Sequence, residues 1–355
     1  GMRAHEAIDF LVRAADIEAE TATHEQAFET LATIVDNRHY VDRGADQRRL
    51  LNRLDQLAAN PFQRIGALRL RSDNSMHRKE QLDEGLAAAE RAVELATQAG
   101  IDWFRVAGAL NVAILQTMKG EYARAAEGAN ALLAEVRRWP DPRQRCNLLG
   151  KIGFVLDRAG RTCQALELFD AATLDAQTSR YPIAQISALA NAADALLRLG
   201  RPEDALRRLE RSDALRAAHD KLEGAGDAND RVAARGLRLL GRYSEALTRA
   251  QRAIEAMRAR SPGSVASAIA TRANLWLDLG QLARALQDRE LARRAATEPV
   301  EERVVALLDL RLATEANVRA DAAYARGRAL LDEQPQLAME LTARLQLASL
   351  APPAE

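Results

Sequence analysis

Short turns recur along this chain of 355 residues at intervals of about 40 residues. Five of the seven turns contain a glycine, which adopts the positive φ that ends a helix at little cost. Five residues after each turn stands a residue with a small side chain. The turns lie at Lys79–Glu80, Gly120, Gly160, Gly200, Gly241, Gly280 and Ala320, and the small residues are Gly85, Ala125, Ala165, Ala205, Ala246, Ala285 and Ala325. One helix pair of this length cannot bury its apolar face alone, so the repeat predicts an array of stacked helix pairs.

The segment Leu148–Ala172 is the most complete copy of the repeat, with two amphipathic runs that meet at a glycine. Its order of small, turn, small, bulky and small residues resembles the tetratricopeptide-repeat (TPR) family. The residues that carry the resemblance are Gly153, Gly160, Ala165, Phe169 and Ala172, with Tyr122 and Tyr243 at the aromatic position of other copies. The resemblance covers residues 61–332 and, more weakly, 4–59. A repeat of about 40 residues instead of about 34 implies longer helices and a different superhelical pitch.

A second resemblance narrows the biological setting. Residues 84–100 read EGLAAAERAVELATQAG, and the N-terminal region contains AIDFLVRAADIEAE. Both stretches are similar to the C-terminal helical region of large bacterial regulators that carry a signal-transducing ATPase, including the ATP-dependent LuxR-type regulators. This resemblance implies that the chain is the sensing or scaffolding part of a bacterial signalling or transcription regulator.

The composition also favours an all-α fold. Aromatic residues make up only 4% of the chain, whereas alanine, leucine and arginine, which favour helices, are abundant. We therefore expect an all-α solenoid, for which the TPR resemblance implies a right-handed superhelix of antiparallel helix pairs. The expected organisation is an N-terminal region at 4–59 that joins or caps the array, a repeat array at 61–332, and a capping helix at 334–349. Within the first region, helices are expected at 4–19, 24–36 and 46–59.

The charge balance and the cysteine content limit the kinds of partner and the cellular compartment that we expect for this chain. Lys+Arg and Asp+Glu are balanced at 50 each, so no global field draws the chain to nucleic acid or to an anionic membrane. Cys146 and Cys163 stand near the starts of two antiparallel helices, about 20 Å apart, which is too far for a disulfide. With no apolar run long enough to span a membrane, we expect a cytoplasmic protein. The oligomeric state has no signature in the sequence.

Catalytic and metal-binding patterns are missing from the sequence. The five histidines stand apart from one another, and there is no phosphate-binding glycine loop and no serine-nucleophile motif. The paired carboxylates Glu301 and Glu302 are expected on an exposed helix start, where the helix dipole favours them. We therefore expect a non-enzymatic protein without a cofactor or a metal ion.

The TPR resemblance implies where a ligand would bind. In that family the first helix of each pair lines the concave side, and a fixed register points side chains into the groove. Transferred to the first helices expected at 146–159, 186–199, 227–240 and 266–279, this register gives the candidate groove residues. They are Asn147, Phe154, Asp157, Asn191, Asp194, Arg231, Arg235, Arg238 and Asn274.

Three of these candidates, Arg231, Arg235 and Arg238, form a stripe on one helix face. Arginine presents a planar fork that suits a carboxylate or a phosphate, so the stripe could hold an acidic peptide or a phosphorylated ligand. Alternatively the arginines pair internally with Asp194, Asp227, Asp230 or Asp278. Three further residues, Asn74, Asn111 and Lys151, partly match the TPR pattern that binds a peptide carboxylate.

The sequence therefore predicts a non-catalytic binding module that holds a protein or peptide ligand in a concave groove. Two alternatives stay open: a self-contained TPR adaptor, and a sensor of a small effector molecule.

Overall fold

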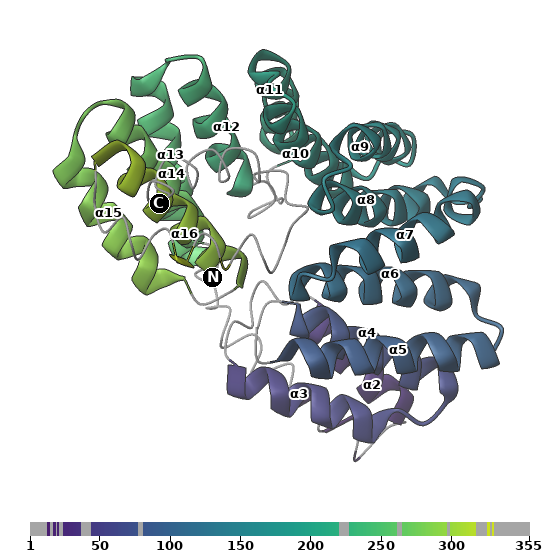
Figure 1. The fold of residues 1–355 in the computed structure, drawn as a ribbon. Helices are drawn as coiled ribbons and strands as arrows, with labels where there is room; N and C mark the ends of the chain where they lie inside the picture. The colour runs from purple at the N-terminus through teal and green to yellow at the C-terminus, as the bar shows by residue number, and fades with distance from the viewer. Residues whose placement is uncertain are drawn as a thin grey trace, which may run out of the picture. The chain divides into compact units, whose positions relative to one another are not determined.

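The computed structural model of this chain describes residues 24–36, 44–76, 81–219, 227–260, 265–296 and 299–316, with a few isolated positions near both ends. These residues form helices joined by short turns, and no strand occurs among them (Figure 1). The helices are α2 (His24–Asp36), α3 (Gly44–Leu57), α4 (Pro61–Ser75), α5 (Leu82–Gln98), α6 (Asp102–Lys119), α7 (Tyr122–Arg137), α8 (Pro142–Arg158), α9 (Thr162–Thr178), α10 (Pro182–Arg198), α11 (Pro202–Ala217), α12 (Asp227–Leu239), α13 (Tyr243–Arg260), α14 (Val265–Asp278), α15 (Leu282–Ala295) and α16 (Pro299–Ala316). The prediction of an all-α solenoid is confirmed.

The helix boundaries agree closely with the sequence prediction where the chain is described. The helix predicted at 24–36 is α2, and the helix predicted at 46–59 is α3. The first helices α8 and α10 begin four residues earlier than predicted, at Pro142 and Pro182, because the missing N–H and fixed φ of proline suit the first helical position. The helices predicted at 4–19 and 334–349 lie almost entirely outside the described residues.

The glycine turns have the backbone conformation that the repeat predicts. Positive φ angles occur at Gly120, Gly160, Gly200, Gly241 and Gly280. At the third turn of the series, the amide of Arg161 donates to the carbonyl of Leu156 over 2.8 Å, which satisfies a carbonyl at the end of α8. Two further turns with a positive φ lie outside the predicted series, at Gly100 with a φ of 67° and at Arg180 with a φ of 51°.

The small residues after the turns allow the two helices of a pair to approach closely. Ala125, Ala165, Ala205, Ala246 and Ala285 are each 0% exposed. A Cβ atom at Gly85 would lie 2.3 Å from Cβ of Ser75 on α4, so only glycine fits there. Ala325 departs from the pattern because it is exposed.

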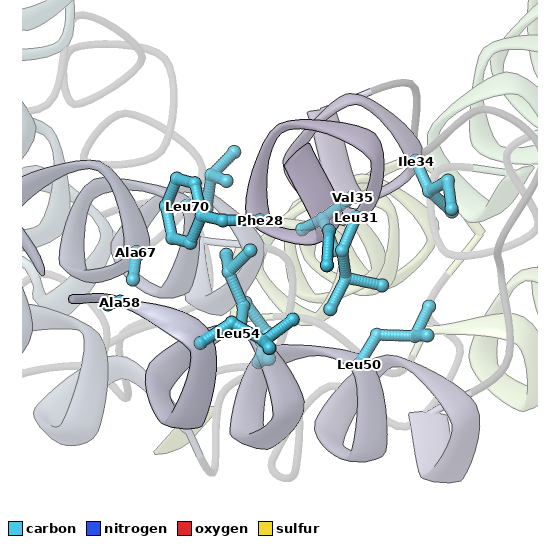
Figure 2. Packing of buried hydrophobic residues seen from close by; sticks show 12 residues of the cluster. Phe28, Leu31, Ile34, Val35, Leu50, Leu54, Ala58, Ala67 and Leu70 are labelled. Carbon is cyan, nitrogen blue, oxygen red and sulfur yellow. The ribbon is translucent and has the colours of Figure 1, made fainter. Parts of the chain in front are cut away.

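The chain divides into two compact units at residues 115 and 116, within α6. In unit 1, α2, α3 and α4 share one apolar core, to which Phe28, Leu31, Leu54 and Leu70 contribute (Figure 2). In unit 2, successive helix pairs bury separate clusters of alanine and leucine along the array. Each cluster is formed by helices that neighbour one another in the chain. The first helices of successive helix pairs can therefore form one continuous surface along the array.

None of the described helices combines the length and apolar character that crossing a membrane requires. Cys146 is buried and Cys163 is exposed, and both are free thiols, as the helix-pair geometry predicts.

Candidate ligand-binding face

The first helices of unit 2 pack against one another in series, from α8 to α10, α12, α14 and α16. The second helices α9, α11, α13 and α15 pack mainly between the first helices on either side of them. Because neighbouring first helices touch directly, unit 2 bends toward them. We call the surface formed by α8, α10, α12, α14 and α16 the first-helix face. Its polar side chains form the candidate site.

Ion pairs connect α8, α10 and α12 across this face. Arg198 of α10 donates from Nε to Oδ1 of Asp157 on α8 over 3.1 Å. The same guanidinium lies 2.8 Å from Oδ2 of Asp194, one turn earlier on α10. Arg235 of α12 donates to the other carboxylate oxygen of Asp194. Two carboxylates and two arginines therefore link three successive repeats.

A second set of contacts continues the connection to α14 and α16. Arg238 of α12 donates from Nε to Asp278 of α14 over 2.6 Å, and Arg311 of α16 donates to the other oxygen of the same carboxylate. Arg311 also donates to the side-chain oxygen of Asn274 over 2.8 Å. We call all these pairs, from Asp157 to Arg311, the Asp–Arg ladder.

The arginines of the ladder favour the ionised form of two of its carboxylates, those of Asp194 and Asp278. Burial alone would raise the pKa of Asp194, but the charges of Arg235 and Arg198, followed by Arg231 and Arg158, lower it far below its usual range. Burial likewise opposes ionisation of Asp278, whose pKa is nevertheless lowered by its hydrogen bonds with arginines. At neutral pH Asp194 and Asp278 are therefore negatively charged in a partly desolvated environment.

Arg158 of α8 and Arg231 of α12 differ from the arginines of the ladder. Neither pairs with a carboxylate within the described residues, although Arg158 lies over the ring of Phe154 at 5.3 Å from the ring centroid. Desolvation lowers the pKa of both guanidinium groups, and repulsion from Arg198 and Arg235 contributes in the same direction. Both side chains are nevertheless only half-buried.

The first turn of α16 carries two buried polar side chains. Arg303 donates to the hydroxyl of Tyr122 at the start of α7, so the two ends of the described array in unit 2 meet there. Glu301 accepts hydrogen bonds from the backbone amide and the hydroxyl of Ser267 on α14. The prediction that Glu301 is exposed was wrong: it is 4% exposed, because α16 packs its first turn directly against α14. Burial raises the pKa of Glu301, with hydrogen bonds from Ser267 opposing the shift.

The structure places the nine predicted groove residues in three environments. Asp157, Asp194, Arg235, Arg238 and Asn274 belong to the Asp–Arg ladder. Asn147 is exposed, while Phe154, Asn191 and Arg231 are half-buried. Internal pairing thus accounts for two arginines of the predicted stripe and leaves the third available. Which of the nine bind a ligand stays a prediction.

Sequence reasoning missed Arg158 and Arg198. A signal was present, since Arg158, Arg198 and Arg238 recur at 40-residue spacing on successive first helices, followed at the next step by Asp278.

Two residues of the predicted carboxylate clamp, Asn74 and Asn111, lie in unit 1 and make hydrogen bonds within that unit. The amide of Asn74 donates to the carbonyl of Leu70, and the amide of Asn111 donates to Asp73, each over 2.8 Å. These amides thus support contacts within unit 1.

No group of three or more histidine, cysteine, aspartate or glutamate side chains is arranged to hold a metal ion in the part of the chain that the structure describes.

We compared the sequence and the structure of this chain with those of known proteins. No protein-family model matches the sequence, and no curated protein sequence is significantly similar to it. A crystal structure of a Rap protein complexed with Competence and Sporulation Factor matches with a TM-score of 0.62, 12% identity, and coverage of 97% of each chain. NprR in complex with its cognate peptide NprX matches with a TM-score of 0.60, 14% identity, and coverage of 92% of this chain and 97% of that one.

A third similar structure is a Signal Transduction ATPase with Numerous Domains (STAND) from Pyrococcus horikoshii that has a tetratricopeptide repeat sensor. It matches with a TM-score of 0.57 and 16% identity, over 98% of this chain and 54% of that protein. At these identities the comparisons establish the fold alone. The chain has the fold of tetratricopeptide-repeat proteins.

Proposed function

We propose that this tetratricopeptide-repeat chain is a non-catalytic binding module that holds a peptide or an extended protein segment on the first-helix face of unit 2. It acts as the sensor or scaffold of a bacterial signalling or transcription regulator in the cytoplasm. The observation that carries the proposal is the first-helix face itself. There the Asp–Arg ladder connects five successive first helices, while other polar and aromatic side chains of the same helices remain accessible.

A face of this kind suits a peptide for physical reasons. The ladder fixes the relative positions of neighbouring helices, so the binding side chains are organised before the ligand arrives and less entropy is lost on binding. Asn147 and Asn191 offer amide groups that can both donate to and accept from a peptide backbone. Phe154 is half-buried and offers an apolar surface for a side chain of the ligand. The proposal is also supported by the Rap and NprR structures, which are complexes with Competence and Sporulation Factor and with the cognate peptide NprX, respectively.

Affinity selection from a defined pool of random pentapeptides tests this proposal. Immobilised protein would be incubated with the pool, and retained peptides would be identified by mass spectrometry. We expect selective retention by the native chain and weaker retention by the double variant Asn147→Ala/Asn191→Ala. Glu167→Ala, on the exposed side of the second helix α9, is the matched control and should retain peptides normally. Retention that is equal in all three proteins would contradict binding at the first-helix face.

A further inference from the structure

We propose that the contact between Tyr122 and Arg303 is a latch, which holds unit 2 closed and has to open before an extended segment can bind on the first-helix face. The inference rests on the proposed function, because it concerns how binding at that face is regulated. The two side chains belong to α7 and α16, the first complete helix of unit 2 and the last helix that the structure describes. Their contact is autoinhibitory, since it stabilises the arrangement of helices that excludes the ligand.

The latch completes a closed circuit of contacts in unit 2. α7 packs on α8, and the Asp–Arg ladder then connects α8 through α10, α12 and α14 to α16. Nη1 of Arg303 on α16 donates to the hydroxyl of Tyr122 on α7, which lies 181 residues earlier in the chain. In such a circuit the first helices cannot move apart unless one of the contacts breaks. The contact that breaks most easily therefore decides whether the first-helix face can widen.

The latch is the weakest contact of this circuit. Every other step joins helices that also pack directly on each other: α7 on α8, α8 on α10, α10 on α12, α12 on α14 and α14 on α16. α7 and α16 share no packing of this extent, so their connection depends on a few side chains. Separating the two helices exposes little apolar surface, and the cost of opening is mainly that of the hydrogen bond. Opening at this point also leaves the ladder intact.

The burial of the latch makes its opening reversible. Tyr122 is 5% exposed and Arg303 is 8% exposed, so little water reaches the hydrogen bond between them. Removing water from a charged group costs free energy, and opening lets water return to the guanidinium group of Arg303. This gain offsets part of the hydrogen bond that opening breaks. The closed and open arrangements are therefore close enough in free energy for a ligand to shift the balance between them.

The first turn of α16 also lies where a ligand would have to enter. In that turn Glu301 accepts hydrogen bonds from the backbone amide and the hydroxyl of Ser267 on α14. Two residues later, Arg303 contacts Tyr122 on α7. A single helical turn thus bridges α14 and α7, and all four side chains are buried. In the closed arrangement this turn fills the space between the two ends of unit 2, through which an extended segment would reach the first-helix face.

Distances between two spin labels measure opening without any ligand. Nitroxide labels would be attached to Ala123→Cys on α7 and Glu315→Cys on α16, two exposed positions, in the full chain. The chain would also carry Cys163→Ser, because Cys163 is an exposed thiol, whereas Cys146 is buried. Pulsed electron paramagnetic resonance should give one narrow distance distribution when the latch is native.

Three variants connect the distances to the latch. Tyr122→Phe removes only the hydroxyl that accepts from Arg303, and Arg303→Met removes the donor. Both should add a population at longer distance. Tyr243→Phe is the matched control and should add none, because Tyr243 begins α13 as Tyr122 begins α7, and its hydroxyl makes no hydrogen bond within the described residues. Tyr122→Phe deletes a single oxygen atom, so it tests the latch even if Arg303→Met unfolds.

Retention of the random pentapeptides measures the consequence for ligand binding. Loss of a hydrogen bond to a charged group should raise the ratio of open to closed protein by about tenfold to a hundredfold. Binding becomes tighter by the same factor as long as the closed arrangement predominates. We therefore expect Tyr122→Phe and Arg303→Met to retain the pentapeptides more strongly than the native chain, and Tyr243→Phe to retain them equally.

Failure of this inference differs from failure of the proposed function. One distance distribution shared by the native chain, Tyr122→Phe and Arg303→Met would overturn the latch. A population at longer distance without stronger retention would overturn its autoinhibitory role while leaving a peptide-binding module. If no protein retains the pentapeptides, the proposed function fails. Longer distances in Tyr122→Phe and Arg303→Met, but not in Tyr243→Phe, would then still uphold the latch.

Discussion

Two glycines of α8 allow the close packing of one helix pair to be measured against a matched control. A Cβ atom at Gly153 would lie 2.7 Å from Cε1 of Phe169 on α9, closer than carbon atoms normally approach. Phe169 is 1% exposed, so its ring has no free space into which to move. A Cβ atom at Gly150, three residues earlier on the same helix, would meet nothing within 4 Å. Gly153→Ala and Gly150→Ala therefore differ mainly in this contact.

The magnitude follows from two opposing effects. Replacing glycine by alanine inside a helix stabilises it by about 0.5–1 kcal/mol, and both variants gain this contribution. Overpacking a well-filled core costs about 1–3 kcal/mol, and only Gly153→Ala incurs this cost. We therefore expect Gly153→Ala to be less stable than Gly150→Ala by about 1–3 kcal/mol.

Thermal unfolding followed by circular dichroism at a helix-sensitive wavelength measures this difference. In a unit the size of residues 116–355, each kcal/mol shifts the melting temperature by about 2–4 °C. Gly150→Ala should melt at or above the native temperature, and Gly153→Ala about 2–12 °C below Gly150→Ala. Equal melting temperatures, or a higher one for Gly153→Ala, would refute the packing argument.

Three further predictions concern polar groups. Arg198→Gln breaks contacts with two carboxylates and should destabilise unit 2 by about 3–5 kcal/mol, whereas Arg158→Gln removes an unpaired charge and should leave the urea midpoint unchanged or raised. Because the folded pKa of Asp194 is lowered, the native chain should lose stability as the pH falls below about 4, and Asp194→Asn should lose less over the same range in acid titrations followed by fluorescence. The pKa of Glu301 is raised in the folded chain, so the stability that its protonated form contributes is lost as the pH rises above about 4.5, the pKa of the group in the unfolded chain. Glu301→Gln should abolish this loss of stability in the same titration.

The sequence predicts local features of this fold well because they depend on residues close together in the chain. The turn at Gly160 requires only a residue that tolerates positive φ, and the start of α4 requires only a capping side chain before a proline. Asn60 fills that role, since its side chain accepts from the amide of Gln63 over 2.9 Å. The small residue Ala165 is equally visible, because its position is fixed relative to the turn.

The candidate site was less predictable because it depends on how successive repeats pack. Glu301 stands at a helix start, which favours an exposed carboxylate, but its burial is decided by contact with Ser267 on another helix. The stripe of arginines on α12 was visible in the sequence, but only the packing of α10 and α14 shows that two of them pair with aspartates. Arg158 could have been found by comparing equivalent positions in successive repeats, since Arg198 stands one repeat further on.

Photo-crosslinking tests the central claim most directly. Peptides retained from the random pool would carry a benzophenone side chain, and crosslinked protein segments would be identified by mass spectrometry. A ligand held on the first-helix face should crosslink to α8, α10 and α12, and the crosslinks should weaken strongly in the double variant Asn147→Ala/Asn191→Ala. Crosslinks that fall mainly on α9, α11 and α13, or that persist unchanged in the double variant, would contradict the account.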